Sequence, residues 1–304
     1  MSRRHRSNTL PAPAWTRRKM LALLVAAGCA ALLLVAGLVL AVTTAVTPRS
    51  RHAAAAQSDT NNVTLTVPGA GSAASSGESA QIAAEDVLAA RQMPQVDQSV
   101  SEPGPVSTRN PGPAIVLPPS TGNGAAGVPT GYPHTAAGAM AQMAAIDQTA
   151  LQSGSLAGAR SVITAWALPG GPTASSWSGV AALAQFFDAA GLSGGGSAQL
   201  SIVATPLMGL VKGTVGPDFV IPCVDFEIDA TLTTTARVGI ADCERMVWTP
   251  NNTSPTMSSP GSQTGGQWIV GPGSEPATPP SVWPDTDTAV TVGYHDLTTA
   301  TGHA

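Results

Sequence analysis

Histidine is the first residue type to consider for catalysis in this chain. His134 falls at the start of a predicted helix, and His295 lies near the C-terminus. Either imidazole could act as a general base if a carboxylate such as Asp147 or Asp296 lay beside it. The sequence has no His-Glu-x-x-His and no phosphate-binding loop. We therefore expect surface or helix-capping histidines, and we assign no catalytic residue and no cofactor.

Carboxylates are concentrated on one predicted hairpin, at Asp225, Glu227, Asp229, Asp242 and Glu244. A calcium site needs oxygen ligands that converge from a loop, whereas successive side chains of a strand point to opposite faces. In the register described next, Asp242 and Glu244 lie on the face opposite to the other three. We therefore expect solvated carboxylates, with no metal site and no pair of glycosidase-type catalytic acids.

Cys223 and Cys243 are the two cysteines of the C-terminal half. An even pair in an exported domain typically forms a disulfide, whereas a redox-active pair is more often a close Cys-x-x-Cys. If the two cysteines face each other on antiparallel strands, the same register forms two further pairs: Asp229 with Arg237, and Phe219 with Val247. One register thus gives a cystine, an ion pair and an apolar pair. We predict a structural disulfide between Cys223 and Cys243.

The elements that must position these residues follow from hydrophobic periodicity. Helical spacing predicts three helices, over about 135–153, 156–166 and 176–191. A period of two then predicts four strands, over 200–215, 219–229, 237–248 and 267–270. Helices followed by a strand meander predict one α+β domain over 131–304, with the helices packed on one face of an antiparallel sheet. Acidic residues alternate with apolar ones in 219–229, which is typical of a half-solvated sheet.

The N-terminal region predicts a membrane anchor. Residues 20–42 are 23 consecutive residues without a charge, and as a helix they would span about 34 Å, enough for a hydrocarbon core of roughly 30 Å. Six basic residues and no acidic residue precede this run, whereas all 18 acidic residues follow it. The positive-inside rule then predicts a cytoplasmic tail at 1–19, a transmembrane helix at 20–46 and an outer C-terminal part.

Three alternatives for the apolar run stay open. A signal peptide could be cleaved near Ala45. The residues that end in Cys29 resemble a lipobox, so Cys29 could carry a lipid. The arginine pair Arg17-Arg18 is similar to that of a twin-arginine export signal. The length of the run favours an uncleaved anchor, in which Cys29 is a small apolar residue of the helix.

A tether is predicted between the anchor and the folded domain. Residues 47–130 consist mainly of Ala, Ser, Gly, Pro and Thr, and the repeated prolines after 102 prevent a long helix or ladder. Such a composition cannot bury enough apolar surface to offset the entropy of ordering. We expect a disordered linker with a root-mean-square span of roughly 50 Å.

Composition and charge exclude several classes of protein. Charged residues are 11% of the chain and aromatic residues 4%, with 32 Gly and 26 Pro, which argues against a coiled coil or a polytopic transporter. Residues 131–304 contain 4 Lys or Arg against 12 Asp or Glu, a net charge of −8. That charge disfavours direct binding to nucleic acid or to anionic lipid.

Three segments carry a resemblance to a known family: Gly131-Tyr132-Pro133-His134-Thr135 with Gly138, Ala241-Asp242-Cys243-Glu244-Arg245-Met246-Val247-Trp248, and Trp283-Pro284 to Gly293-Tyr294. Residues 131–297 resemble a family of uncharacterised actinobacterial membrane-anchored proteins that are associated with integrative and conjugative elements. The element order also resembles the bitopic scaffold subunits of conjugation channels, whose outer domain is nuclear-transport-factor-2-like. These resemblances imply a role in DNA transfer across the envelope and no assigned activity.

We therefore expect a non-enzymatic, single-pass protein of the cell membrane, with a cytoplasmic N-terminus and an extracytoplasmic C-terminal domain. Its expected partners are the bilayer, through the helix, and other envelope proteins, and a homo-oligomer is compatible with this role. The alternative is a wall-directed hydrolase or a ligand-binding domain tethered to the membrane. The stretch Trp283–Leu297 is expected either to pack back over the sheet or to form a partner-binding edge, and packing is the commoner role.

Overall fold

The computed structural model describes residues 71–192, 195–250 and 265–299, which belong to one compact unit. The predicted tail 1–19, the predicted transmembrane helix 20–46 and the first part of the predicted linker, 47–70, lie outside the described residues. Within the described part, no helix has the length and apolar character that a membrane span requires.

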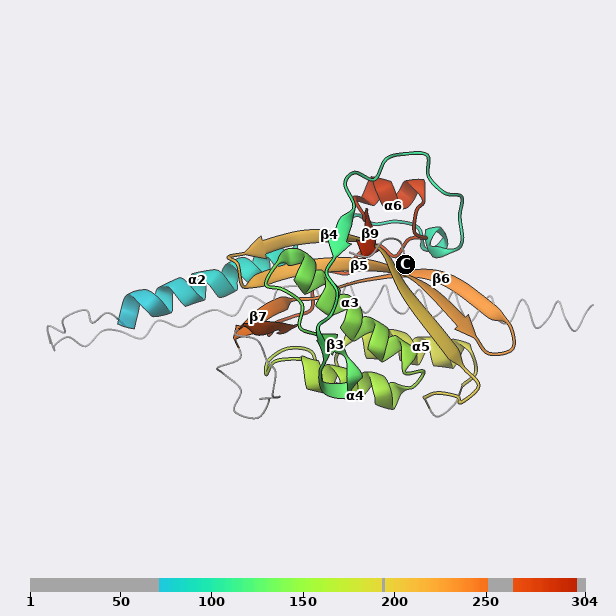
Figure 1. Ribbon diagram of the computed structural model, residues 1–304, viewed down its shortest axis with the longest axis horizontal. Helices are drawn as coiled ribbons and strands as arrows, with labels where there is room; N and C mark the ends of the chain where they lie inside the picture. Colours follow the sequence, from blue (N-terminus) through green and yellow to red (C-terminus); the bar gives the residue numbers. More distant parts are fainter. Residues whose placement is uncertain (1–70, 193–194, 251–264, 300–304) are drawn as a thin grey trace, which may run out of the picture. The chain divides into compact units, whose positions relative to one another are not determined.

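Three helices form one layer of the fold: α3 (Ala136–Gln152), α4 (Leu156–Trp166) and α5 (Ser178–Ala189). The sequence predicted all three from helical spacing, and α3 and α4 begin at residues that cap helices well. The Thr135 hydroxyl accepts a hydrogen bond from the Gly138 N–H at 3.0 Å. The Ser155 hydroxyl does the same for the Gly158 N–H at 3.1 Å. Figure 1 shows the three helices together on one face of the sheet.

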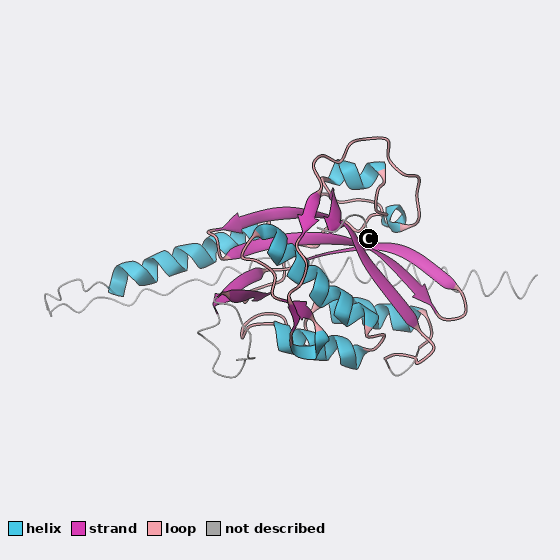
Figure 2. Ribbon diagram, in the orientation of Figure 1, coloured by secondary structure: helices cyan, strands magenta, loops and turns pink. Residues whose placement is uncertain are grey.

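A curled sheet forms the second layer. Among the described residues it has seven strands: β1 (Ile115–Leu117), β4 (Ser201–Val215), β5 (Phe219–Thr231), β6 (Thr235–Cys243), β7 (Met246–Pro250), β8 (Gly266–Val270) and β9 (His295–Thr299). Their order is β1-β9-β4-β5-β7-β8, with β6 also paired to β5, and β1 with β9 is the parallel pair. Bulges in β4 after Pro206 and after Val211 interrupt its pairing with β5 and increase the local twist. The predicted α+β class, with helices on an antiparallel-rich sheet, is confirmed (Figure 2).

The predicted hairpin register is confirmed. Cys223 pairs with Cys243, and the two residues are joined by a disulfide with a Cα–Cα distance of 4.1 Å. Asp229 pairs with Arg237, and the Arg237 Nε lies 2.9 Å from an Asp229 carboxylate oxygen. Because the disulfide closes a loop of 20 residues, it stabilises the fold by about 3 kcal/mol.

The predicted strand 237–248 is interrupted. Glu244 and Arg245 separate β6 from β7, and the two strands pair with different parts of β5. Val247 still lies opposite Phe219, as the register predicted. Both residues of the break are almost fully buried. The single-strand prediction is therefore wrong at the two charged residues, whose side chains leave the ladder to form buried polar contacts.

The expected disordered linker is wrong for its described part. Residues 71–130 contain α2 (Gly71–Ala90), a 3₁₀ helix (Gln98–Ser101), β1, and a small sheet of β2 (Gly122–Asn123) and β3 (Pro129–Thr130). The C-terminal end of α2 packs on β4, where the Lys212 Nζ donates a hydrogen bond to the Ala89 carbonyl at 2.8 Å. Arg245 forms ion pairs with Glu85 and Asp86 of α2. The alanine-rich segment orders because the sheet supplies partners that its own composition lacks.

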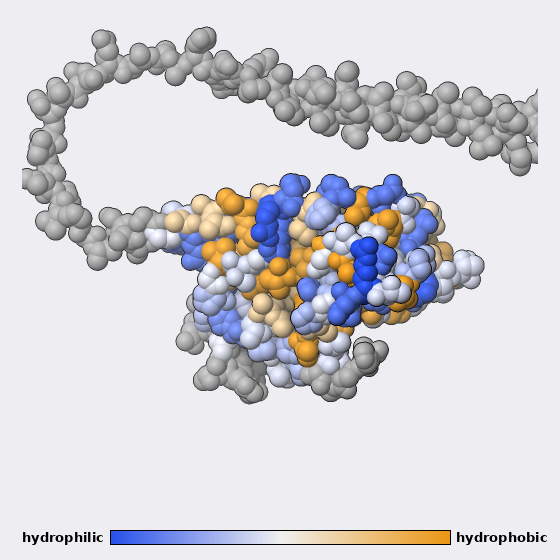
Figure 3. Space-filling model, turned by 90° about the horizontal axis from the view of Figure 1, so that it is seen from above, coloured by the Kyte–Doolittle hydropathy of each residue, from blue (hydrophilic) through white to orange (hydrophobic). Residues whose placement is uncertain are grey.

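The second face of the sheet is also covered, so the expected half-solvated sheet is wrong. A second apolar cluster includes Met208, Phe219 and Ile221 of the sheet and Tyr294 near the C-terminus. The stretch Trp283–Leu297 forms α6 (Asp287–Val292) and part of β9, and it packs back over the sheet, as the first of its two alternatives predicted. Seen from the side of α6, the surface carries apolar groups separated by polar ones (Figure 3).

Candidate functional site

A cavity of about 320 Å³ lies between α3 and α5 and the concave face formed by β4, β5 and β6. We call it the helix–sheet pocket. Its walls are largely apolar and include Leu151, Phe186, Ile202, Phe226, Ile228 and Ile240. Its polar lining comes from Asp147, Ser178, Asp242, Glu275, Thr278 and Ser281. A cavity of this size with apolar walls and a few convergent polar groups is typical of small-molecule sites.

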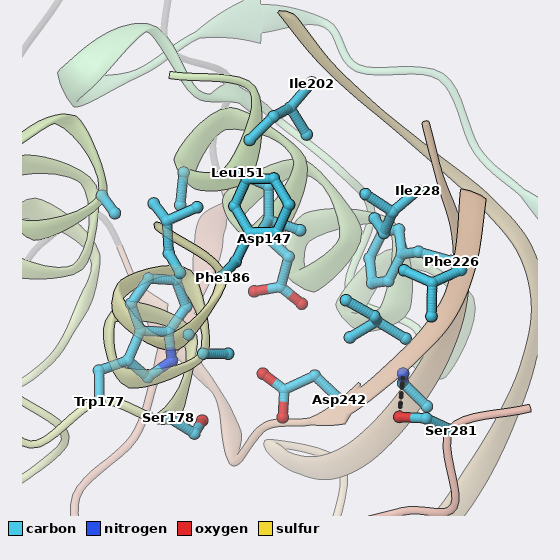
Figure 4. A pocket seen from close by; sticks show the side chains of 18 of the residues that line it. Asp147, Leu151, Trp177, Ser178, Phe186, Ile202, Phe226, Ile228, Asp242 and Ser281 are labelled. Atoms are coloured by element: carbon cyan, nitrogen blue, oxygen red, sulfur yellow. Dashed lines mark hydrogen bonds between the residues drawn. The ribbon is translucent and has the colours of Figure 1, made fainter. Parts of the chain in front are cut away.

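Two carboxyl groups point into the helix–sheet pocket from opposite walls. Asp147 comes from α3 and Asp242 from β6, and Figure 4 shows their carboxyl groups directed toward the same space. Asp147 is only 4% exposed, and neither of its oxygens has a hydrogen-bond partner among the described residues. One oxygen of Asp242 accepts the Cys243 N–H at 2.8 Å. Asp147 is therefore a buried polar group that the fold leaves available to something in the pocket.

Burial controls the protonation of these groups. It raises the pKa of Asp147 well above the usual value, and the nearby carboxylates of Asp242 and Glu244 raise it further. Burial also raises the pKa of Asp242 to about 7, with a contribution from Glu275. Desolvation penalises the charged form, so Asp147 retains its proton near neutral pH when the pocket is empty, and Asp242 is divided there between its protonated and charged forms. In the protonated form they can donate hydrogen bonds, and after losing a proton they can balance a cation.

A polar network supports the pocket at the start of α5. The Trp177 indole N–H donates a hydrogen bond to Glu244 at 2.5 Å, and both side chains are buried. The Ser178 N–H, at the first residue of α5, donates to Glu275 at 2.8 Å. A carboxylate at a helix N-terminus satisfies a free N–H group and complements the helix dipole. Glu244 and Glu275 therefore fix Trp177 and Ser178 in the pocket wall.

The sequence predicted solvated carboxylates on the hairpin, and this is wrong for three of the five. Asp225 is fully buried and Glu244 is 1% exposed, while Asp242 lines the pocket. Glu227 and Asp229 keep access to solvent and both pair with Arg237. The strand alternation contained a signal for Asp242, because its partner Val224 belongs to the apolar face of the strand.

Asp225 lies on the other face of the sheet, away from the pocket. Both of its oxygens are buried, and burial raises its pKa to about 8 although the backbone N–H of Val282 acts in the opposite direction. Asp225 and Asp242 together help to raise the pKa of Tyr294, after burial itself. The Tyr294 hydroxyl donates a hydrogen bond to the Pro280 carbonyl at 3.1 Å. Asp225 is thus a neutral side chain of the second apolar cluster at neutral pH.

Neither histidine that the sequence singled out lines the helix–sheet pocket. The His134 ring stacks on Trp248 with centroids 4.3 Å apart, and its Nε2 lies 2.9 Å from Asp218. This pair is partly exposed at the surface. The structure therefore gives His134 the partner Asp218 and not Asp147.

His295 and the remaining candidates lie elsewhere. His295 lies on β9, and its Nδ1 is buried with no hydrogen-bond partner in the part of the chain that the structure describes. Cys29 lies outside the described residues. Within the described ranges, no three His, Cys, Asp or Glu side chains are grouped so that they could hold a metal ion.

Comparison with protein-family models, with curated proteins and with solved structures finds no match for this chain. The chemistry of the helix–sheet pocket is therefore the basis for its functional interpretation.

Proposed function

We propose that this protein is a membrane-tethered, extracytoplasmic domain that binds a small, largely apolar molecule in the helix–sheet pocket. The observation that carries this proposal is the cavity of about 320 Å³ between α3, α5 and the sheet. Its apolar walls favour removal of a ligand's hydrocarbon surface from water. Asp147 and Asp242 provide the few polar contacts that orient a ligand in such a site.

Filling the pocket with a larger side chain should weaken the binding of an apolar ligand. Ala182 of α5 lines the pocket and is itself exposed, so Ala182→Trp can add bulk at this position without displacing a buried side chain. We expect the affinity for adamantanol, a compact neutral probe, to fall about tenfold or more, which corresponds to at least about 1.4 kcal/mol of binding free energy. Isothermal titration calorimetry on the full chain in lipid nanodiscs, with empty nanodiscs as the blank, measures this change.

Ala181→Trp is the matched control, because Ala181 is the exposed neighbour on the same helix and does not line the pocket. It should bind adamantanol as the unsubstituted chain does. If the unsubstituted chain does not bind adamantanol, or if both variants lose binding equally, the pocket is not the ligand site.

The cellular location in this proposal rests on the charge asymmetry around residues 20–46. Six basic residues precede the apolar run and no acidic residue does, which favours a cytoplasmic N-terminus. The disulfide between Cys223 and Cys243 is typical of an oxidising, extracytoplasmic compartment.

Thiol labelling tests this topology. In a Cys29→Ser chain, Cys223 and Cys243 are the remaining cysteines. Both are buried, so Asp188→Cys is added to place a thiol at an exposed position, and an impermeant maleimide should label that thiol in intact cells. Labelling that requires lysis would contradict the outer location.

Assembly with other envelope proteins in DNA transfer stays a prediction, and it rests on the resemblance of residues 131–297. The absence of enzymatic activity also stays a prediction, and it rests on the lack of a convergent set of catalytic residues in the sequence. We also infer a nuclear-transport-factor-2-like architecture for the domain. Helices that precede a curled antiparallel sheet, with a pocket between the two layers, support this inference. Of the two functions expected from the sequence, the pocket favours the ligand-binding alternative.

A further inference from the structure

The polar groups of the helix–sheet pocket are distributed unevenly. In Figure 4, Leu151, Ile202 and Ile228 lie toward the upper side of the pocket and Ser178, Asp242 and Ser281 toward the lower side. Asp147 extends its carboxyl group from the upper side toward Asp242. A ligand that uses the whole cavity therefore needs an apolar body and one polar group.

The charges of the lining define that polar group. The ionisable residues that line the pocket are Asp147, Asp242 and Glu275, and the described lining contains no Lys, Arg or His. Glu244 adds a further carboxyl group behind the Trp177 indole. Each carboxylate that is buried without a cation or sufficient hydrogen bonds is costly. The pocket thus supplies negative charge and hydrogen-bond acceptors without a cation of its own.

We propose that the ligand is an organic cation, with a compact apolar body and a protonated amine that binds between the carboxyl groups of Asp147 and Asp242. This inference rests on the proposed function. An ammonium group gives Asp147 the hydrogen-bond donor that the described residues do not provide. An acidic ligand would add like charge beside three carboxyl groups, and a bare metal ion would gain nothing from the apolar walls.

Binding of an amine is linked to proton release. The groups that face the ammonium site are Asp147 from α3, Asp242 from β6, Glu244 from the turn after β6, and Glu275 from the segment before α6. Burial raises the pKa of Asp147 and of Glu244 well above their usual values, so both hold protons when the pocket is empty, and it raises the pKa of Asp242 to about 7. An ammonium ion stabilises the carboxylate form, so a proton must leave as the amine enters. The amine should therefore bind about tenfold more tightly at about pH 8 than at about pH 6.

Three probes of one shape separate the possibilities: adamantylamine, adamantanol and adamantanecarboxylate. At about pH 8 the affinity for the amine should be at least about tenfold higher than the affinity for the alcohol. The carboxylate should bind more weakly than either. Calorimetry on the full chain in nanodiscs, in two buffers of different ionisation enthalpy, also counts the protons released.

Asp147→Asn and Asp242→Asn should each weaken amine binding about tenfold or more, with less than about a threefold effect on the alcohol. Asp188→Asn is the matched control, because Asp188 is exposed on α5 and does not line the pocket. Two separate pocket variants keep the test informative if one of them does not fold.

The outcomes distinguish the two proposals. If adamantanol binds in the pocket but the amine binds no better, or if the amine's affinity does not depend on pH, the organic-cation inference is wrong and the ligand-binding function stands. If none of the three probes binds, both are contradicted. If the amine binds in preference to the alcohol and both aspartate variants lose this preference, the inference is supported.

Discussion

Replacement of Arg245 by methionine should lower the free energy of unfolding by about 3–5 kcal/mol. The Arg245 side chain is 3% exposed, and its Nη1 lies 2.9 Å from Asp86 while its Nη2 lies 3.7 Å from Glu85. It also lies over the Phe219 ring, 5.2 Å from the centroid. Methionine can fill much of the space, but it leaves the largely buried Glu85 without its cation. Such loss of one partner of a buried ion pair is among the most destabilising single changes.

The same substitution should release α2 from the sheet. Urea unfolding gives the change in stability, and limited proteolysis at room temperature should show earlier cleavage within Gly71–Ala90. Arg237→Met is the matched control, because Arg237 also pairs with two carboxylates, Glu227 and Asp229, but at the surface. Its effect should be far smaller. Equal losses for the two variants would show that Arg245 does not hold α2 on the fold.

Replacement of Asp225 by asparagine should stabilise the domain at neutral pH and above. Asp225 is buried and its pKa rises from about 3.8 to about 8 on folding. Between these values the folded protein holds one proton that the unfolded chain has lost, so the free energy of unfolding falls as pH rises. The slope is about 1.4 kcal/mol per pH unit for this residue. Near pH 7 the asparagine variant should therefore be more stable by about 4 kcal/mol.

The contribution of Asp225 is isolated by measuring the free energy of unfolding against pH for the unsubstituted chain and for the asparagine variant, and taking the difference. Asp147, Asp242 and Glu244 also have raised pKa values. Their contributions to the pH dependence of stability are the same in both proteins and cancel in the difference. Urea midpoints measured from about pH 5 to about pH 8 should diverge with rising pH. Asp188→Asn, at an exposed position, should leave the curve unchanged. Parallel curves for the Asp225 variant would mean that this carboxyl group is already ionised in the folded protein.

The helices could be predicted from the sequence because their signals are local. Thr135 and Ser155 cap α3 and α4 through hydrogen bonds to residues three positions away, and Gly191, at positive φ (+70°), follows α5. The hairpin register could also be predicted, because one alignment matched Cys223 with Cys243 and Asp229 with Arg237.

Apart from the C-terminal stretch Trp283–Leu297, the cover of the second face of the sheet could not be predicted, because it comes from distant parts of the chain. Composition marks 71–130 as a segment that cannot bury enough apolar surface by itself to become ordered. Order there depends on partners such as Lys212 and Arg245. The same missing cover made Asp225 look like a solvated carboxylate when it is buried.

The pocket was missed for a different reason. Asp147 occurs in a helix among apolar residues, and no local pattern identifies it as facing Asp242 of a strand about a hundred positions later. Motif searches detect residues close together in the chain, whereas this pair meets only after α3 has packed on the curled sheet. The position of Asp242 on the apolar face of β6 was the one signal for it. That signal alone could not show that Asp147 of α3 faces Asp242 across the pocket.

The parallel pairing of β1 with β9 has a consequence for biogenesis. It joins Ile115 to Leu297, two residues that lie about 180 positions apart in the chain. Contacts so distant in sequence form late and slow the folding reaction. A chain that emerges N-terminus first cannot close this edge until β9 has been synthesised. We therefore expect folding intermediates to expose the edge of β4 that later pairs with β9. A chaperone that binds the nascent chain would protect this edge from aggregation.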